Sequence, residues 1–422
     1  MCMNRNQFRF AFALMAAAAG MGAAANAQTQ TFRLIGALPG SNTFSSGYGV
    51  SEDGSVVVGH SGNNYYYGSS SHAFRWSDET GIQDLDVLAP AAAAYAVSGD
   101  GLTIAGSEIS GSTSALRWGT SNSAVSEQLF HGGEIYGISR DGSTFVGYDA
   151  SGGGGGGGGG AFRPHRAIRY TDRGRVEFID TNALANTSEA LGASADGSVV
   201  VGWTLLNTVG NRAFRWTAAD GMVNIAASVV SNYSRAAAVS GDGSVVVGEF
   251  NTNGAVHAFR WTAAGGFMDM GTLPGFRTSS AYAITADGST IFGRSTDATG
   301  LNQRAFIWRA DLGMRDLNVI LGGVVPAGFV LTEARACNAT GTVIAGGSKT
   351  PTNGVEAWVV TGFTTNVCAA DFNRSGAADV ADIFDFLTVW FASDVRADFN
   401  GVDGVGVADI FDFLTAWFAG CP

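Results

Sequence analysis

The sequence predicts an all-β fold for most of the chain, because one short hairpin pattern recurs seven times. Each copy has a small residue, an Asp-Gly pair or its remnant, an apolar run and a glycine, followed in the plainest copies by an Ala-aromatic-Arg-aromatic segment. The plainest copies begin at Ser51 and Ser240. Asp-Gly is a strong hairpin signal since both residues tolerate positive φ, and self-similarity at a near-constant period marks a repeat architecture.

The spacing of the copies predicts four strands in each unit. The turns lie 41 to 55 residues apart, close to the period of four-stranded propeller blades. A small alternating strand comes first, and an apolar strand such as 245–247 follows the turn. The aromatic strand, such as 259–261, and a short strand, such as 221–225, complete a unit. The turns are at Asp53, Asp100, Asp141, Asp196, Asp242 and Asp287, with Thr340-Gly341 as a degenerate seventh.

The two ends of the array predict a closed ring. The seventh unit stops at 358–360 without a fourth strand, whereas the segment 32–40 is a strand with no unit of its own. That segment matches the fourth strand of unit five, residues 267–275. Since closure removes exposed sheet edges, we expect a seven-bladed β-propeller closed by the N-terminal strand. An open β-solenoid would need capping units at both ends.

The first 27 residues are predicted to be a secretory signal peptide. Arg5 and Arg9 precede an apolar stretch that ends in the small residues 25–27, so cleavage is expected after Ala27. A membrane anchor is the weaker alternative, because the segment is short, rich in Ala and Gly and ends in a cleavage pattern, and no later apolar run is long enough to span a bilayer. Without it the net charge changes from −12 to −14, which argues against nucleic acid as a partner. We expect a protein that is secreted, extracellular or at the cell surface.

Residues 31–362 resemble the extracellular repeat family named for its His-Ala-Phe triplet. The triplet is present literally at 72–74 and 257–259, and Arg or Glu replaces the histidine elsewhere. The resemblance implies an exported β-structure and no particular activity. Residues 363–367 then form a linker.

The tail, residues 368–422, contains the same sequence motif twice, 27 residues apart. Each motif is a twelve-residue, oxygen-rich loop followed by an amphipathic helix, with the spacing of an EF-hand-like calcium loop. In loop one we expect Ca²⁺ to be held by the side chains of Asp371, Asn373, Ser375, Asp379 and Asp382 and by the carbonyl of Ala377. A solvated acidic surface is the alternative, but the double occurrence and the fixed spacing favour a metal site.

Loop two is a poorer match to the same pattern. Valine stands at position 5, and an aspartate takes the position of the glycine that the sharp turn requires. The candidate ligands there are Asp398, Asn400, Asp403 and Asp409. Cys368 and Cys421 bracket the tail and are a candidate disulfide in an oxidising compartment.

The duplicated loop-helix units resemble a dockerin module, and the Gly-Cys-Pro ending resembles the tail modules of planctomycete-type bacteria. The resemblance implies docking onto a cohesin-like or other cell-envelope protein. The tail lacks the usual Ser/Thr pair at loop positions 10 and 11, which are Val-Ala in both loops. A standard cohesin partner is therefore in doubt.

The two tail helices are rich in aromatic residues. A unit of 55 residues cannot bury them all, so we expect some in its core and the rest in a docking face. The candidate residues of this face are Phe384, Leu387, Trp390, Phe391, Phe411, Leu414, Trp417 and Phe418.

The search for an active site finds none of the motifs of hydrolases, metalloproteases or paired-cysteine metal sites. One internal comparison suggests a ligand face, because the residue after each second-strand glycine varies widely in chemistry from unit to unit. Idle loops would show the same variety. The candidate residues are His60, Tyr148, Trp203, Glu249 and Arg294.

The sequence therefore favours a non-enzymatic exported propeller, attached to a surface or an extracellular assembly by a calcium-dependent tail. The alternatives are a carbohydrate-binding or carbohydrate-hydrolysing propeller with the same tail, and a purely structural envelope protein. A hydrolase would need two carboxylates about 5 to 10 Å apart, and the sequence places no such pair.

Overall fold

The structure is a computed structural model, and every structural statement below concerns the residues that it describes. The predicted signal peptide, residues 1–27, lies outside them. The described ranges are 30–39, 44–62, 71–85, 91–108, 113–119, 126–150, 165–171, 174–180, 185–206, 210–227, 232–321, 323–364, 370–372, 378–392, 397, 399 and 404–420.

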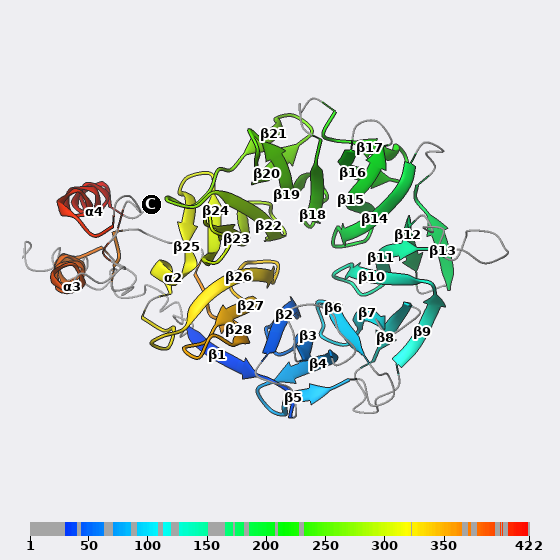
Figure 1. Ribbon diagram of the computed structural model, residues 1–422, viewed down its shortest axis with the longest axis horizontal. Helices are drawn as coiled ribbons and strands as arrows, with labels where there is room; N and C mark the ends of the chain where they lie inside the picture. Colours follow the sequence, from blue (N-terminus) through cyan, green and yellow to red (C-terminus); the bar gives the residue numbers. More distant parts are fainter. Residues whose placement is uncertain are drawn as a thin grey trace, which may run out of the picture. The chain divides into compact units, whose positions relative to one another are not determined.

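The described strands form five four-stranded antiparallel sheets and one eight-stranded sheet, arranged as a ring (Figure 1). Consecutive strands pair within each four-stranded sheet. In chain order these sheets are β6 (Ala92–Val97), β7 (Ile104–Glu108), β8 (Ser114–Trp118) and β9 (Ser126–His131); β10 (Gly133–Ile138), β11 (Thr144–Asp149), β12 (Arg166–Thr171) and β13 (Arg175–Phe178); β14 (Ala185–Ala193), β15 (Val199–Leu206), β16 (Gly210–Thr217) and β17 (Gly221–Asn224); β18 (Ser234–Val239), β19 (Val245–Thr252), β20 (Ala255–Thr262) and β21 (Gly266–Asp269); β22 (Thr278–Ile284), β23 (Thr290–Thr296), β24 (Gln303–Arg309) and β25 (Gly313–Asp316).

The eight-stranded sheet consists of two halves with the same pattern. A parallel bridge between Phe44 and Val355 joins their strands into one sheet. One half holds β2 (Phe44–Val50), β3 (Val57–Gly62), β4 (His72–Ser77) and β5 (Gly81–Asp84), and the other holds β26 (Val330–Cys337), β27 (Ile344–Lys349), β28 (Val355–Thr361) and β1 (Thr31–Gly36). The predicted all-β, propeller-like fold is confirmed.

Three helices are described. The short α2 (Leu317–Ile320), which the sequence did not predict, follows β25 and is capped by Asp316. The tail, taken by itself, contains α3 (Val380–Phe391) and α4 (Val407–Ala419), at the two predicted positions. None of the described helices is both long and apolar enough to cross a membrane.

The Asp-Gly pairs form the tight turns that the sequence predicted, and the turn at Asp242 shows how. The hydroxyl of Ser240 donates to Asp242 Oδ1 (2.6 Å) and accepts from the N–H of Val245 (2.9 Å). Gly243 has a φ of +74°, and a Cβ there would lie 2.3 Å from a methyl group of Val199 in the preceding sheet. Glycine is therefore required both by the backbone conformation and by the close approach of two sheets.

The recurring Ala-aromatic-Arg segment links several sheets to the next one. Where the first strand of the following sheet has a serine at the matching position, the alanine N–H donates to its hydroxyl, as from Ala213 to Ser234 (2.9 Å). Its arginine Nε donates to the glycine carbonyl of the following turn, as from Arg215 to Gly243 (3.1 Å). The alanine bond recurs at Ala167–Ser188 and Ala258–Ser279, and the arginine bond at Arg169–Gly197.

The first and last strands of the repeat array, β1 and β28, meet through the same kinds of contact. β1 pairs antiparallel with β28, from Thr31 opposite Thr361 to Gly36 opposite Ala357. The Ala357 N–H donates to the Ser45 hydroxyl (2.9 Å), which in turn donates to the Gly36 carbonyl (2.5 Å). Ala258, Ser279 and Gly271 repeat this arrangement inside the array, at 2.8 and 2.5 Å. The N-terminal strand thus occupies the fourth-strand position for which the sequence analysis proposed it.

Backbone hydrogen bonds also join each turn to the turn of the next unit. The N–H at or just before each turn aspartate donates to a backbone carbonyl in the next turn, from the bond of Glu52 to Gly99 to the bond of Ala286 to Ala339. Between the last and the first unit a side chain takes the place of the carbonyl, because the Ala339 N–H donates to the Glu52 carboxylate. Arg140 also forms an ion pair with Glu52.

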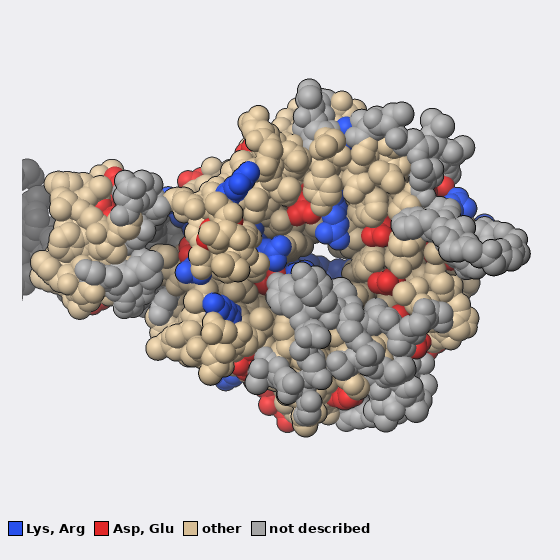
Figure 2. Space-filling model, viewed as in Figure 1, with Lys and Arg blue, Asp and Glu red and all other residues tan. Residues whose placement is uncertain are grey.

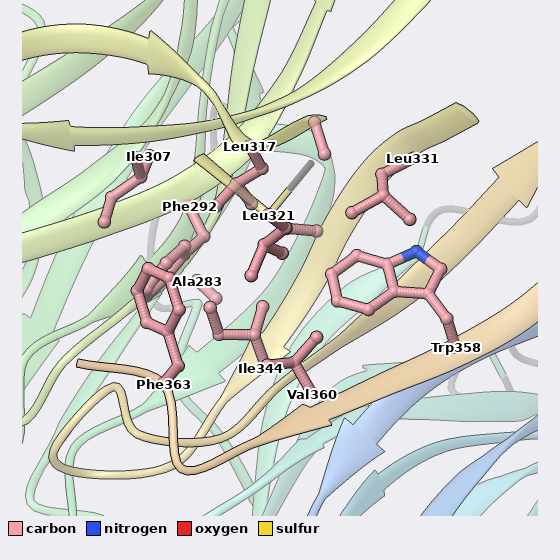
Figure 3. Close-up of a cluster of buried hydrophobic side chains, with 12 residues drawn as sticks. Ala283, Phe292, Ile307, Leu317, Leu321, Leu331, Ile344, Trp358, Val360 and Phe363 are labelled. Carbon is pink, nitrogen blue, oxygen red and sulfur yellow. The ribbon is translucent and has the colours of Figure 1, made fainter. Parts of the chain in front are cut away.

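Apolar cores lie between neighbouring sheets. Figure 3 shows one of them, where Trp358 and Ile344 of the last repeat face Phe292 and Ile307 of β23 and β24. Leu317 of α2 is fully buried in this core and replaces apolar contacts that a strand would make elsewhere. Because each core needs two sheets, an end sheet without a neighbour would expose one apolar face.

We expect the closing contact to stabilise the protein as much as an internal one. Ser45→Ala leaves the buried N–H of Ala357 without an acceptor, so the free energy of unfolding should fall by about 1–3 kcal/mol. The measurement is urea denaturation of the full chain. Ser279→Ala is the matched control at an internal junction and should cost the same. Closure would be contradicted if Ser45→Ala left the free energy of unfolding unchanged while Ser279→Ala lowered it.

Stability should also fall in acid because of the turn aspartates. The Ser240 hydroxyl, together with the N–H and hydroxyl of Ser244, lowers the pKa of Asp242 from 3.8 to about 2. The pKa is lowered at Asp53, Asp100, Asp141, Asp196 and Asp287 as well. A lowered pKa in the folded state stabilises the fold above pH 3.8, and this contribution is lost as the pH falls towards 2. Thermal melts across this range should show a falling Tm, with a shallower fall in an Asp242→Asn, Asp100→Asn variant. An equal fall in that variant would assign the effect to other carboxyl groups.

Candidate functional site

A β-bulge occurs at the same place in every first strand, and its extra residue points toward the centre of the ring. The pairing with the second strand skips one residue each time, as Tyr48 is skipped between Gly47 and Gly49. The skipped residues are Tyr48, Tyr95, Tyr136, Leu191, Ala237, Tyr282 and Arg335. All of them except Arg335 line a cavity of about 210 Å³ along the axis. Since a bulge re-aims a side chain, the repeat itself builds this lining.

Aromatic contacts join part of this lining into an arc. The ring centroids of Tyr48 and Tyr95 are 5.8 Å apart, and those of Tyr95 and Tyr136 are 5.5 Å apart. Arg335 lies between Tyr48 and Tyr282, with its Cζ 4.9 and 4.8 Å from their ring centroids. Leu191 and Ala237 supply aliphatic side chains in place of rings on the remaining side.

The predicted ligand-face residues form a second ring, which lies next to the ring of bulge residues along the axis. We call this second ring, together with its first-strand partners, the mouth. The register pairs each second-strand residue with the first-strand residue two positions before the bulge, as Tyr148 with Glu134 and Trp203 with Glu189. The second-strand members are His60, Ser107, Tyr148, Trp203, Glu249, Arg294 and Gly347, and their partners are Ser46, Ala93, Glu134, Glu189, Arg235, Ser280 and Glu333. Figure 2 shows acidic and basic side chains together around the central opening.

One side of the mouth is acidic and aromatic. Tyr148 Oη donates to Glu134 Oε1 (3.0 Å), and Trp203 Nε1 donates to Glu189 Oε2 (3.2 Å). His165 links the two carboxylates, because its ring stacks on Tyr148 at 3.9 Å and its Nδ1 lies 2.9 Å from Glu189 Oε1. Burial, with a smaller contribution from the charge of Glu189, raises the pKa of Glu134. These contacts place two carboxylates beside two aromatic rings at one opening.

The other side carries guanidinium groups that are already paired. Glu333 is 3% exposed, and its Oε1 accepts from Arg335 Nε (2.7 Å) and Ser46 Oγ (3.2 Å). Arg294 Nη1 lies 3.6 Å from Glu333 Oε2. Burial would raise the pKa of Glu333, but the two guanidinium groups overcome it and hold that pKa below its usual value. Glu333 is therefore neutralised, and the two guanidinium groups leave this side with a net positive charge.

The predicted ligand-face residues differ in accessibility. His60 is 1% exposed and packs between Phe44 and Tyr48, with ring centroids 5.1 Å away on either side. Burial lowers its pKa to about 4, so it is neutral at pH 7 and acts as a packed ring. Tyr148 is also buried. Trp203, Glu249 and Arg294 are partly exposed, and Glu249 accepts a hydrogen bond from Tyr233 Oη (2.5 Å).

The sequence analysis missed Glu134, Glu189, Glu333 and Arg335, which lie on the first strands. A signal was present, because every first-strand member of the mouth stands seven residues before the turn position that Asp53 occupies in the first unit. The bulge residues stand five before it. Comparison of the units at these two offsets would have found both rings.

The tail presents the second group of candidate residues. In loop one, Asp371, Asp379 and Asp382 are described, while Asn373, Ser375 and Ala377 lie outside the described residues. In loop two only Asp409 is described, and Asp398, Asn400 and Asp403 lie outside, as do Cys368 and Cys421. Within the described residues no three His, Cys, Asp or Glu side chains are grouped as a metal site.

The last ligand position of each loop is a buried carboxylate that bends back over its own loop. Asp382 Oδ2 accepts from the N–H of Asp379 (2.8 Å), and Asp409 Oδ2 accepts from the N–H of Gly406 (2.7 Å). Both carboxylates lie in the first helical turn and are at most 1% exposed. A buried carboxylate held beside a loop with further acidic positions fits the oxygen-rich donor set of Ca²⁺.

The two halves of the tail pack symmetrically. Phe386 and Phe413, 27 residues apart, are fully buried and stack with centroids 4.3 Å apart and planes at 7°. Trp390 Nε1 donates to the carbonyl of Gly406 (2.8 Å), and Trp417 Nε1 donates to that of Asp379 (2.9 Å). Each helix thus bonds to loop position 9 of the other half.

The predicted docking face divides into two sets. Leu387, Trp390, Leu414 and Trp417 are partly buried and pack against the Phe386–Phe413 core. The other four aromatic side chains remain in solvent: Phe384 (65% exposed), Phe391 (77%), Phe411 (65%) and Phe418 (79%). We call these four the exposed phenylalanines.

Comparison with known proteins finds no matching family model and no matching curated protein. Among solved structures, the β-propeller domain of the Trilobed protease from Pyrococcus furiosus is 14% identical over 64% of this chain and 82% of its own, with a TM-score of 0.46. TolB from Acinetobacter baumannii is 10% identical over 73% and 80%, with a TM-score of 0.42. An oligogalacturonate lyase from Vibrio parahaemolyticus is 10% identical over 79% and 97%, with a TM-score of 0.47. Identities and scores at this level bring no activity or partner to this chain.

Proposed function

We propose that the chain is an exported, non-enzymatic, seven-bladed propeller closed by its N-terminal strand. A dockerin-like tail that binds Ca²⁺ attaches it to a cell surface or an extracellular assembly. The observation that carries this proposal is the set of exposed phenylalanines, which are more than 60% exposed although the tail has a well-packed core. Solvent-exposed aromatic side chains on short helices are costly in a monomer and typical of a protein interface.

The internal symmetry of the tail supports an attachment role. Each helix presents one phenylalanine in its first half and one near its end, Phe384 and Phe391 in α3 and Phe411 and Phe418 in α4. The reciprocal tryptophan bonds fix the two helices relative to each other, so the four rings belong to one rigid unit. A preformed apolar surface loses little conformational entropy on binding.

Calcium would be held in loop one by Asp371, Asn373, Ser375, the Ala377 carbonyl, Asp379 and Asp382. When bound, the metal supplies a multidentate crosslink between the oxygens of the loop. Asp382 orients the loop by accepting the N–H of Asp379, and Trp417 binds the Asp379 carbonyl from the other half. The order of loop one therefore affects the placement of α4 as well as α3.

A second candidate function is carbohydrate binding at the mouth. The acidic side combines the partly exposed indole of Trp203 with the carboxylates of Glu134 and Glu189, and the buried Tyr148 donates to Glu134. Sugars present apolar C–H faces and a rim of hydroxyl donors, which such a set can bind by ring stacking and by hydrogen bonds to carboxylates. The paired charges of the opposite side give no comparable platform.

Attachment is tested with the full-length protein and native cell-envelope preparations. Envelope retention should require calcium and should fall at least tenfold in EDTA or in a Phe391→Ala, Phe418→Ala variant, since both rings lie on the surface. A Leu301→Ala variant is the control, because Leu301 is 81% exposed on the propeller. Retention that is insensitive to EDTA and to the phenylalanine variant would contradict the proposal.

Carbohydrate binding is tested by applying the full chain to a glycan array. Trp203→Ala should lower the signal of any bound glycan at least tenfold, because the variant removes the exposed ring. Val223→Ala, at a 45% exposed position of β17 in the same sheet, is the control and should bind as the wild type does. An array without signal would remove this second candidate and leave the attachment role standing.

A further inference from the structure

The mouth has an excess of negative charge on one side only. Arg294 and Arg335 both face Glu333, and Arg235 stands opposite Glu249 in the ladder. In the described part of the chain, no arginine or lysine lies within ion-pair distance of Glu134, and the only ion-pair partner of Glu189 is His165. Two partly buried carboxylates thus lie together without a permanent cation.

The groups around these carboxylates suit an organic cation better than a metal ion. Glu134 already accepts hydrogen bonds from Tyr148 and Tyr136, and the two oxygens of Glu189 are bonded to His165 and Trp203. Hard metal ions need six to eight oxygens, which this set cannot supply. An ammonium group donates only three hydrogen bonds, which the remaining lone pairs can accept, and gains further from the face of the partly exposed Trp203 ring.

The rest of the ring leaves space for a group larger than an ammonium ion. Small residues occupy several mouth positions beside and beyond the acidic side: Ala93 and Ser107 on the adjoining sheet, and Ser46, Ser280 and Gly347 further round the ring. The central opening is visible in Figure 2. A ligand can therefore place its cation at Glu134 and Glu189 while its body stacks on Trp203 and extends across the opening.

We propose that the mouth binds a carbohydrate that carries a protonated amine, such as an oligosaccharide of unacetylated amino sugars. This inference rests on the second candidate function, carbohydrate binding at the mouth, and specifies its ligand class. Glu134 and Glu189 recognise the ammonium group, and Trp203 recognises the sugar face. Acetylation of the amine removes both its charge and two of its three donors, so the neutral sugar loses the interaction that distinguishes this site.

The experiment is calorimetric titration of the full-length protein with three probes: a glucosamine tetramer, its fully N-acetylated counterpart and spermidine. We expect the glucosamine tetramer to bind at least tenfold more tightly than either of the other two. Glu134→Gln and Glu189→Gln should each weaken that binding at least tenfold while leaving the acetylated tetramer unaffected. Glu177→Gln, on the half-exposed Glu177 of β13 in the same sheet as Glu134, should change nothing.

The three probes separate the possible failures. Equal binding of both tetramers would overturn the ammonium inference and leave carbohydrate binding in place. Spermidine binding as tight as that of the glucosamine tetramer would overturn the assignment to a carbohydrate. No binding of any probe to the wild-type protein would overturn the inference, and with an empty glycan array it would remove the second candidate function as well.

Discussion

The pairing of β1 with β28 is the contact on which the rest of the propeller depends. Each repeat can bury its apolar faces only between two neighbours, so a row of repeats would end in two exposed faces and two free edges. The strand at Thr31–Gly36 removes both by joining the last sheet, where the bonds at Ser45 repeat those at Ser279. The first and last units then have the same environment as the internal ones.

Closure also determines what the centre of the molecule can do. Once the sheets form a ring, the bulge in every first strand directs one side chain toward the axis, and the residue two positions earlier lies at the mouth. The repeat conserves backbone geometry at these positions and leaves the side chains unconstrained. Variation from tyrosine to alanine to arginine is therefore tolerated, and chemistry such as the Glu134–Glu189 pair can occupy a regular scaffold.

The sequence predicted the repeat architecture because its signals are local. The Asp-Gly turn, its preceding serine and the apolar strand after it act within about ten residues, and Asp242 with Ser240 shows the bonds behind the pattern. The tail helices were predicted for the same reason. The core of the tail was not, since the sequence analysis did not name Phe386 and Phe413, which are its most buried rings. Periodicity locates an apolar face but does not say which ring on it meets the other helix.

The sequence by itself determined the unit: its turn, its strands and the spare strand that precedes the first copy. Only the tertiary structure decided which residues face one another across the axis, because those residues are separated by whole repeats and share no local pattern. Glu134 and Glu189 are 55 positions apart and become neighbours through the ring. His60, chosen from the same comparison as Trp203, is instead buried between Phe44 and Tyr48, since the packing around each position differs from sheet to sheet. Local chemistry builds the units, and the closed ring selects which of their side chains can act together.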